Sequence, residues 1–502
     1  MNNSEIHAKS AEQGGIIDIN GKYISVADGT LIGAYSYGPG TGTHINITAE
    51  QIDMYGISEE GYHSEISIAD LSNTEVDEPG KISIVAENLT LRDEARIDSF
   101  TTAYGNGGTI DIDVSNITLS GFGSGIYSSV DPSGIADGGE ININAETVTV
   151  ENGAYISSMT YGTGDAGNTN ITADNLNISG ASAENGYASA ITTDTQPFFD
   201  SIKGGDGGIV DIKVKKITLA DGGKISSSSI AQPGTEAGEA GRINITADTV
   251  TATGVNPYGP NEDGYGSGIY ARSYGIGADD AGRIEIDAGQ VNLSEGGVIS
   301  TESTHKGGGV IRLNASDQLH LHNGNITTSV AQGEGQGGDI TLESDLTVMN
   351  RGNITAKADA GDGGAIFISA GHFFRSSDSL VSATSARDND GTVTVDAPDT
   401  ELNELTVLPS DLPDISGWTD ECDPANEDKS RFAVRGKDNA PVSSVRGLRS
   451  DISNSDFSDS LAAVRTAVRY QRAGFQKKAL EMLNDFAPDA KKPGHRRSDC
   501  IP

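Results

Sequence analysis

The 502-residue sequence predicts an all-β protein, a right-handed parallel β-helix of three sheets and about 12–13 coils, followed by a short helical C-terminal tail. Three observations predict this fold. A glycine-led apolar motif recurs along most of the chain, apolar and polar residues alternate over short segments, and 65 residues are glycine against 15 Tyr, 11 Phe and 1 Trp. The glycines lack the strict three-residue period of collagen, which excludes a triple helix.

The recurring motif is Gly-x-[Ile/Val]-x-[Ile/Val/Leu], and two of its copies are looser. Neighbouring copies are separated by 26 to 41 residues, so the shortest repeat has 26 residues and the longer ones carry insertions. The copies begin at Gly15, Thr43, Gly80, Gly108, Gly139, Gly167, Gly208, Gly241, Gly282, Gly309, Gly338, Gly364 and Gly391.

Each repeat contains three short segments with period-two alternation, the pattern of half-buried strands. In the repeat that begins at Gly282, the apolar positions are Ile284 and Ile286, then Val291 and Leu293, then Ile299 before a run of small residues. We expect these residues to point into the coil. The same pattern predicts inward positions at Val148/Val150 and Ile156, Ile217/Leu219 and Ile225, Leu319/Leu321 and Ile326, and Leu346/Val348 and Ile354.

One such coil cannot bury its apolar residues alone, whereas stacked coils form a continuous core and pair each strand with the coils above and below. Parallel connections of this kind are normally right-handed. The recurring glycine is expected at a corner that needs either positive φ or a close approach of two backbones.

Charge divides the chain near residue 428. Residues 429–502 carry 15 basic and 8 acidic groups, whereas residues 1–428 carry 19 basic and 64 acidic groups, which makes net charges of +7 and −45. Such an acidic surface repels nucleic acid and anionic membranes, so neither is an expected partner. No apolar run reaches the roughly 20 residues of a membrane-spanning helix.

The repeats, together with the segment that follows them, resemble the filamentous haemagglutinin-like exoproteins of two-partner secretion systems. The resemblance rests on units such as AGRIEIDAGQVNLSEGGVISTES (281–303) and on the ending GTVTVDAPDTELNELTVLPSDLPD (391–414), Cys422 and SRFAVRGKDNAPVSSVRGLRSD (430–451). It implies a secreted or surface-attached adhesin-like protein of a Gram-negative or cyanobacterial cell, which an outer-membrane pore partner exports.

The secretion domain and signal peptide of that family are not visible, and the repeats are already running by Gly15. We therefore expect this chain to be the C-terminal part of a longer exoprotein. The alternative is a stand-alone protein in which residues 1–13 cap the first coil. The expected domains are the β-helix (1–400), a capping or linker segment (401–455), a helical segment (456–488) and a disordered basic tail (489–502).

Motifs for catalysis, nucleotide binding and zinc binding are not found in the sequence, and no cofactor or metal is expected. His320 and His322 fall on one strand face, which we interpret as a solvated outer face. Acidic pairs such as Asp111/Asp113 and Glu285/Asp287 are interpreted in the same way. The alternative function is a carbohydrate-active β-helix enzyme, a polysaccharide lyase or glycosidase, because such enzymes place paired carboxylates on one external face.

Binding residues are sought where repeats exceed their minimum length, since insertions leave the rod as loops. The insertions 53–63, 194–205 and 255–274 stand out. Their aromatic side chains are candidates for stacking on sugars or anchoring a protein receptor, with packing of the loops onto the rod as the alternative. The candidate residues are Phe198, Phe199, Tyr258, Tyr265, Tyr270 and Tyr274.

The basic tail has its own pattern. Leu461, Val464 and Val468 share one helical face, and apolar residues continue after Gly474, which predicts a broken helix or helical hairpin. Its basic groups suit docking on an acidic partner. Cys422 and Cys500, the two cysteines of the chain, are candidates for a disulfide with each other or for an intermolecular link.

Overall fold

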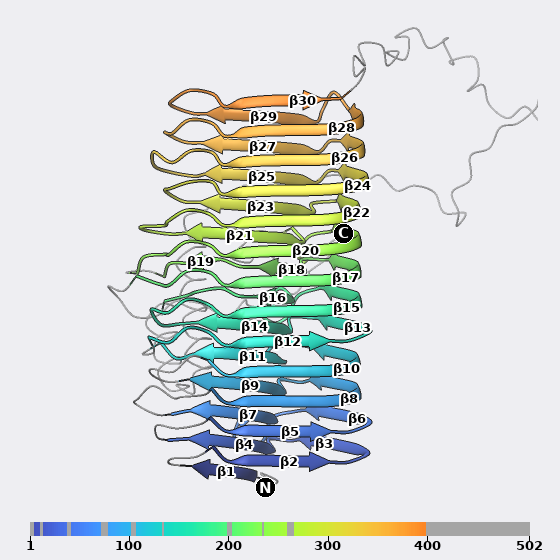
Figure 1. Ribbon diagram of the computed structural model, residues 1–502, viewed down its shortest axis with the longest axis vertical. Helices are drawn as coiled ribbons and strands as arrows, with labels where there is room; N and C mark the ends of the chain where they lie inside the picture. Colours follow the sequence, from blue (N-terminus) through green and yellow to red (C-terminus); the bar gives the residue numbers. More distant parts are fainter. Residues whose placement is uncertain are drawn as a thin grey trace, which may run out of the picture. The chain divides into compact units, whose positions relative to one another are not determined.

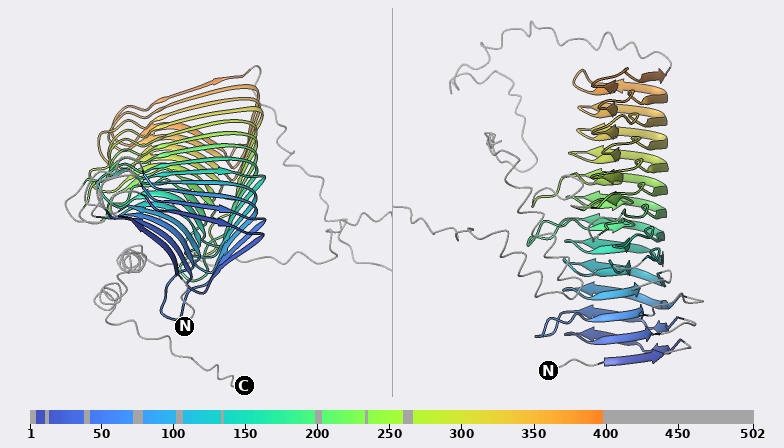
Figure 2. Two further views of the ribbon diagram at one scale, coloured as in Figure 1. Left: turned by 60° about the horizontal axis from the view of Figure 1, so that its bottom comes forward. Right: turned by 90° about the vertical axis from the view of Figure 1, so that its left-hand side faces the viewer.

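A computed structural model describes residues 5–10, 14–37, 42–71, 79–101, 107–132, 135–197, 203–232, 235–258 and 266–397. The unit that holds these residues, Met1–Val407, is a stack of parallel β coils, as Figures 1 and 2 show. The predicted parallel β-solenoid is confirmed, and no helix occurs in the described ranges. The predicted segments 401–455, 456–488 and 489–502, with Cys422 and Cys500, lie outside the described residues.

Two parallel sheets run the length of the stack. The 14-stranded sheet contains β1 (Glu5–Ser10), β4 (Leu31–Ser36), β7 (Glu65–Asp70), β9 (Arg96–Thr101), β11 (Gly125–Val130), β14 (Tyr155–Thr160), β16 (Ala190–Thr192), β18 (Lys224–Ser226), β19 (Ser229–Ile230), β21 (Gly268–Tyr274), β23 (Val298–Ser303), β25 (Asn325–Val330), β27 (Asn353–Ala358) and β29 (Leu380–Ser385).

The 16-stranded sheet contains β2 (Ile16–Asn20), β3 (Tyr23–Ala27), β5 (His44–Thr48), β6 (Gln51–Tyr55), β8 (Lys81–Arg92), β10 (Thr109–Ser120), β12 (Glu140–Asn144), β13 (Thr147–Glu151), β15 (Asn168–Ser179), β17 (Ile209–Ala220), β20 (Arg242–Thr253), β22 (Arg283–Ser294), β24 (Val310–His322), β26 (Asp339–Asn350), β28 (Ala365–Arg375) and β30 (Thr392–Asp396).

The structure therefore has two sheets where the sequence predicts three. In most coils the first two predicted strands join into one bent strand of 11 to 13 residues, as in β10 and β24, because the ladder to the neighbouring coils continues through the bend. Each coil still has three outer faces. We call them the first face (first halves of the 16-stranded sheet), the second face (its second halves) and the third face (the 14-stranded sheet).

The core consists of inward Ile, Val and Leu residues stacked from coil to coil. Ile284, Ile286, Val291, Leu293 and Ile299 are all at most 2% exposed, as the alternation predicts. On several strands of the 14-stranded sheet the inward residue after the isoleucine is a serine that binds a corner carbonyl, whereas other strands place an apolar residue there, such as Ile68 or Ala271. The hydroxyls of Ser128, Ser158 and Ser227 donate to the carbonyl oxygens of Gly108, Gly139 and Gly208 at 3.1, 2.6 and 2.6 Å.

The inward prediction is wrong at Leu346 and Val348. In β26, Thr347 and Met349 are 0% and 1% exposed, while Leu346 and Val348 lie on the outer face and are half-buried. β24 has one more residue than β26 and bulges near Ser316, so its Leu319 and Leu321 pair with Thr347 and Met349. The register of the ladder therefore overrides the local hydrophobic pattern.

Most of the recurring glycines allow two backbones to approach closely, and few of them have a positive φ. Gly309 and Gly338 have φ of 78° and 75°, but most of the other motif glycines do not lie in the left-handed region. At Gly108, an added Cβ would lie 2.6 Å from the carbonyl oxygen of Gly80 on the neighbouring coil. Successive coils therefore meet backbone to backbone at this corner.

Candidate functional site

The structure describes three of the six candidate aromatic residues; Phe198, Phe199 and Tyr265 lie outside the described ranges. Tyr258 lies in the insertion before β21 and is 55% exposed, and Tyr274 at the end of β21 is 53% exposed. Tyr270 is 1% exposed and donates to the carbonyl oxygen of Gly266 at 2.8 Å. Tyr258 and Tyr274 thus remain as exposed rings, one in the insertion and one at the end of β21.

Three insertions share one corner of the coil, between the second and third faces. They lie between β6 and β7, between β15 and β16, and between β20 and β21, and an antiparallel bridge closes each: Ile57 with His63, Ala181 with Ala188, and Val255 with Gly266. We call this corner, residues 56–64, 180–189, 254–258 and 266–267, the insert corner. Loops that leave the stack of coils are visible in Figure 2.

The second and third insertions of the insert corner also contact each other. The Asn256 side-chain amide donates to the carbonyl oxygen of Gly186 at 2.6 Å, although the two residues are 70 positions apart. In the same region, the rings of Phe122 and Tyr187 stack at 5.5 Å between centroids. These contacts fix the loops to each other and to the coils beneath them.

Apolar and aromatic side chains are exposed on two of these insertions, two of them at the closing bridges. Ile57 and Tyr62 are 44% and 62% exposed, and Val255 and Tyr258 are 45% and 55% exposed. Large apolar side chains that remain in water on fixed loops are typical of surfaces that contact partners. The insert corner is therefore the first candidate binding surface.

A second candidate lies on the third face, near the N-terminal end of the stack. Glu65 of β7 lies opposite Arg96 of β9, and Asp98 lies between Ser67 and Tyr127 of the flanking strands. Glu65 and Asp98 are diagonal neighbours, and the spacing and rise of the strands place their Cα atoms roughly 8 Å from each other. The sequence reasoning missed this pair because the two carboxylates are far apart in the chain. Aligning the repeats on Ile66 and Ile97 would have brought them together.

Two glycines make room for the tyrosines around this pair. An added Cβ would lie 2.5 Å from Tyr35 Oη at Gly33 and 2.9 Å from Tyr127 Oη at Gly125, so each ring lies over its glycine. The Nε of Arg96 donates to the carbonyl oxygen of Gly123 at 3.2 Å. The Arg96 guanidinium carbon lies 5.9 Å from the centroid of the Tyr127 ring. The arginine is thus held beside the two carboxylates.

Burial and mutual repulsion perturb both carboxylates. Burial raises the pKa of Asp98 to about 7, the negative charge of Glu65 adds to the rise, and Arg96 opposes it. Burial also raises the pKa of Glu65, against a hydrogen bond from Ser67 and the charge of Arg96. Within the described structure, Asp98 Oδ1 is buried and accepts no hydrogen bond. With a pKa of about 7, Asp98 is partly protonated at neutral pH.

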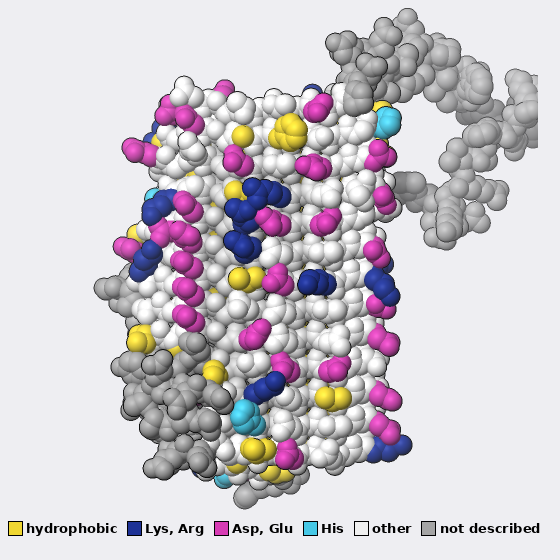
Figure 3. All heavy atoms as spheres, viewed as in Figure 1, with side chains coloured by type: hydrophobic (Ala, Val, Ile, Leu, Met, Phe, Trp, Pro, Cys, Tyr) yellow, Lys and Arg dark blue, Asp and Glu magenta, His cyan; other side chains and the backbone are white. Residues whose placement is uncertain are grey.

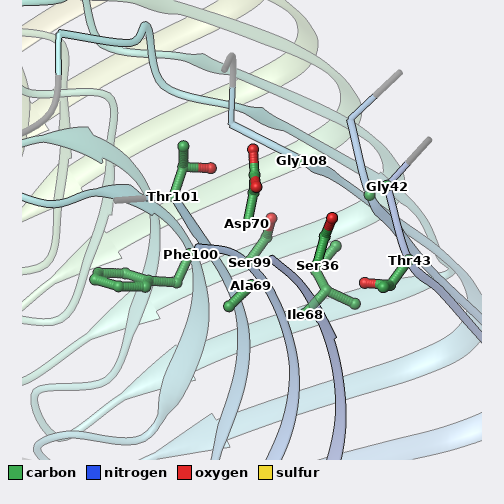
Figure 4. Close-up of a pocket in the computed structure, with 11 residues that line it drawn as sticks. Ser36, Gly42, Thr43, Ile68, Ala69, Asp70, Ser99, Phe100, Thr101 and Gly108 are labelled. Carbon is green, nitrogen blue, oxygen red and sulfur yellow. The ribbon is translucent and has the colours of Figure 1, made fainter. Parts of the chain in front are cut away.

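A small hollow lies beside this cluster, at the ends of β4, β7 and β9. Ser36, Asp70 and Ser99 line it, and Figure 4 shows the Asp70 carboxylate and the two hydroxyls pointing to the same side. Its volume is about 10 Å³, room for one water molecule. Neither Glu65 nor Asp98 lines the hollow, and it is too small for a sugar ring.

The acidic pairs noted in the sequence lie on the outer face, as expected. The side-chain amides of Asn142 and Asn144 donate to Asp111 and Asp113, both at 2.9 Å. Asparagine from the next coil therefore satisfies these carboxylates.

His320 and His322 also lie on the outer face, half-buried, with ring centroids 6.4 Å apart. His322 Nε2 lies 3.2 Å from Glu295 Oε1. Among the described residues, no group of three or more His, Cys, Asp or Glu side chains is placed to hold a metal ion.

The described part of the chain has no helix that is both long and apolar enough to cross a membrane. Comparison of the chain with protein-family models, with curated proteins and with solved structures finds no match.

Proposed function

We propose that this chain is an adhesin-like, non-catalytic interaction rod, secreted or held at the surface of a Gram-negative or cyanobacterial cell. In this proposal it is part of a filamentous haemagglutinin-type exoprotein, exported through an outer-membrane pore partner. The resemblance of its repeats and of the segment after them supports the family and the export route. The exposed apolar and aromatic side chains of the insert corner support the binding role, and they are the observation that carries it.

The stack of coils suits this role because it holds the loops rigidly. Asn256 and Gly186 connect two insertions, and each insertion is closed on itself by a backbone bridge. Preorganised loops lose little conformational entropy when they bind. Exposed tyrosines supply contact area at low entropic cost, which suits either a glycan or a protein receptor.

Retention of cells and of immobilised glycans on the purified full chain tests the proposal. The double variant Tyr62→Ala/Tyr258→Ala should lose most of the retention and keep its circular dichroism and melting temperature. Tyr37→Ala is the matched control, because Tyr37 is 50% exposed at a different corner of the coil. Equal retention by the double variant and the parent chain would refute the insert corner as the binding surface.

A carbohydrate-active enzyme is the second candidate function, and the Glu65 and Asp98 pair favours it. Paired carboxylates flanking a glycosidic bond act as acid and as base or nucleophile, and the pKa of Asp98 suits a general acid. Release of reducing sugar from a polysaccharide panel, lost in Asp98→Asn and in Glu65→Gln, would support this activity. Release by the parent and the variants alike would place the activity elsewhere.

A further inference from the structure

A shallow depression of about 400 Å³ crosses the first face over β20, β22, β24 and β26. It belongs neither to the insert corner nor to the carboxylate pair. The outward side chains that line it are polar and come from four successive strands, while the inward-pointing Ile245, Ile286 and Leu313 also contribute to its floor. The lining side chains used here are Asn244, Glu285, Asp287, Arg312, Asn314 and Thr341.

Arginines gather at this depression on an otherwise acidic rod. Figure 3 shows Lys and Arg side chains grouped on the first face over β20–β24. Arg242 pairs in register with Arg283 on the next strand, and Arg312 follows one strand further on, opposite Glu285. Among the described residues, Arg242 makes no ion pair, so its guanidinium is available at the rim.

The other polar groups of the depression are held in place before any ligand arrives. Arg283 and Arg312 each donate to Glu285 Oε1 at 3.1 Å, and the amide of Asn314 donates to Asp287 at 2.9 Å. Hydrogen bonds from Arg283 and Arg312 lower the pKa of Glu285 against the effect of burial, so it is ionised at neutral pH. Planar guanidinium, carboxylate and amide groups are thus fixed side by side.

An exposed aromatic ring continues the line of outward side chains along the stack. Arg312 pairs with Thr341, and Thr341 pairs with Phe367 of β28, so the three residues form one outward column. Phe367 is 39% exposed. From β20 to β28 the column runs parallel to the stack for roughly 19 Å.

This combination has the chemistry that recognises sugars. Planar side chains with paired donors or acceptors match the neighbouring hydroxyls of a pyranose ring, and an aromatic face packs against its C–H groups. The spacing between coils is close to the length of one pyranose residue in an extended chain. A polymer parallel to the stack would therefore meet one outward side chain of this column at each step.

We infer that the first face over β20–β28 binds an extended polysaccharide that runs along the column from Asn244 to Phe367. This inference deepens the proposed function, on which it rests, by naming a glycan as a ligand and by placing its site outside the insert corner. In the bound state Phe367 packs on one sugar ring, and Arg312, Asn314 and Asp287 hydrogen-bond the hydroxyls of the next ones.

Isothermal titration of the full chain with cello-, malto-, chito- and guluronate hexasaccharides tests the inference. We expect at least one of them to bind. Shorter oligosaccharides of the same sugar should bind more tightly as their length rises to about five residues, because the column has five positions from Asn244 to Phe367. Phe367→Ala should weaken binding by about tenfold. Asn314→Ala should weaken it less, since one hydrogen-bonding group is lost.

Phe374→Ala is the matched control. Phe374 lies on the same strand and is 44% exposed, but it points from the second face, where it stacks on His372 at 6.5 Å. Its loss should leave the titration unchanged. Absence of binding by every hexasaccharide, or equal effects of the two phenylalanine variants, would overturn the inference.

The insert-corner variant Tyr62→Ala/Tyr258→Ala separates this site from the proposed function. It should lose cell retention and keep hexasaccharide binding. If it lost hexasaccharide binding while Phe367→Ala kept it, the glycan site would lie at the corner and the inference would be wrong. If this variant kept its cell retention, the result would refute the insert corner as the binding surface and would leave the inferred glycan site untouched.

Discussion

Replacing Gly108 with alanine tests whether close backbone approach is what the recurring glycine provides. The new Cβ would lie 2.6 Å from the carbonyl oxygen of Gly80 and 2.5 Å from Ser99 Oγ. An ordinary contact needs 3.4 Å or more, so the two coils must separate by about 0.8 Å at this corner. The hydrogen bond from Thr109 N to Gly80 O, now 2.9 Å long, would then exceed 3.5 Å and be lost.

Overpacking costs about 1–3 kcal/mol and the lost hydrogen bond about 1 kcal/mol, so we expect the free energy of unfolding to fall by about 2–4 kcal/mol. Urea unfolding followed by circular dichroism measures this change, and hydrogen exchange in β8 and β10 locates it. The control is Gly307→Ala, where the nearest atom to the added Cβ is a carboxylate oxygen of Asp280 at 3.1 Å, the movable end of a side chain. Equal, small effects of both substitutions would refute the close-approach explanation.

Three further predictions follow from burial and hydrogen bonding. The pKa of Asp98 is about 7 in the folded state and near 4 in the unfolded state, so ionisation of Asp98 lowers the melting temperature as pH rises from about 4 to 7. Asp98→Asn should make the melting temperature less dependent on pH in this range, and the variant should melt higher than the parent at pH 8. An unchanged pH dependence would contradict this prediction. Met349→Ala should lower the free energy of unfolding in urea by about 2–5 kcal/mol because Met349 is buried, whereas Val348→Ala on the outer face should lower it by less than about 1 kcal/mol. The reverse order would show that the inward register is wrong. Asp165→Asn keeps an acceptor for the backbone N–H of Asp206, so its free energy of unfolding should be unchanged or higher. Asp165→Ala removes the acceptor and should lower the free energy of unfolding by about 1 kcal/mol. Equal stability of the two variants would exclude a role for this hydrogen bond.

The coil architecture can be predicted from the sequence because it depends on local signals repeated many times. Ile284 and Ile286 point inward in one repeat, and equivalent residues do so in nearly every other. Where the prediction fails, at Leu346 and Val348, a bulge in the preceding coil sets the register, and no signal inside the repeat reports it.

Contacts between coils are harder to predict than the coils themselves. The pairing of Glu65 with Asp98 depends on which residues of different repeats share a column. The burial of Tyr270 depends on side-chain direction, since the ring folds back toward Gly266 and Gly268. The sequence contains a usable signal in both cases: the aligned isoleucines for the carboxylates, and the Gly-x-Tyr spacing for the rings that lie over a glycine.

The acidity of the rod has a structural cause at one corner, which limits where partners can bind. Where the third face turns into the first, the backbone N–H of Asp165 donates to Asp137 Oδ1 at 2.9 Å, that of Asp206 to Asp165 at 2.8 Å, and that of Glu239 to Asp206 at 2.8 Å. Each carboxylate thus satisfies a backbone donor of the next coil, so the ladder stabilises the corner while it accumulates negative charge.

Crowding along this ladder affects ionisation, since burial and then the charge of Asp206 raise the pKa of Glu239. A partner lying along the corner would have to displace those hydrogen bonds or add cations. Contacts are easier to make where side chains are exposed and do not serve the stack, as Tyr62, Tyr258 and Phe367 are. The ladder therefore gives part of the rod's acidity a structural role, and it leaves the insert corner and the first face as the surfaces on which binding should be sought.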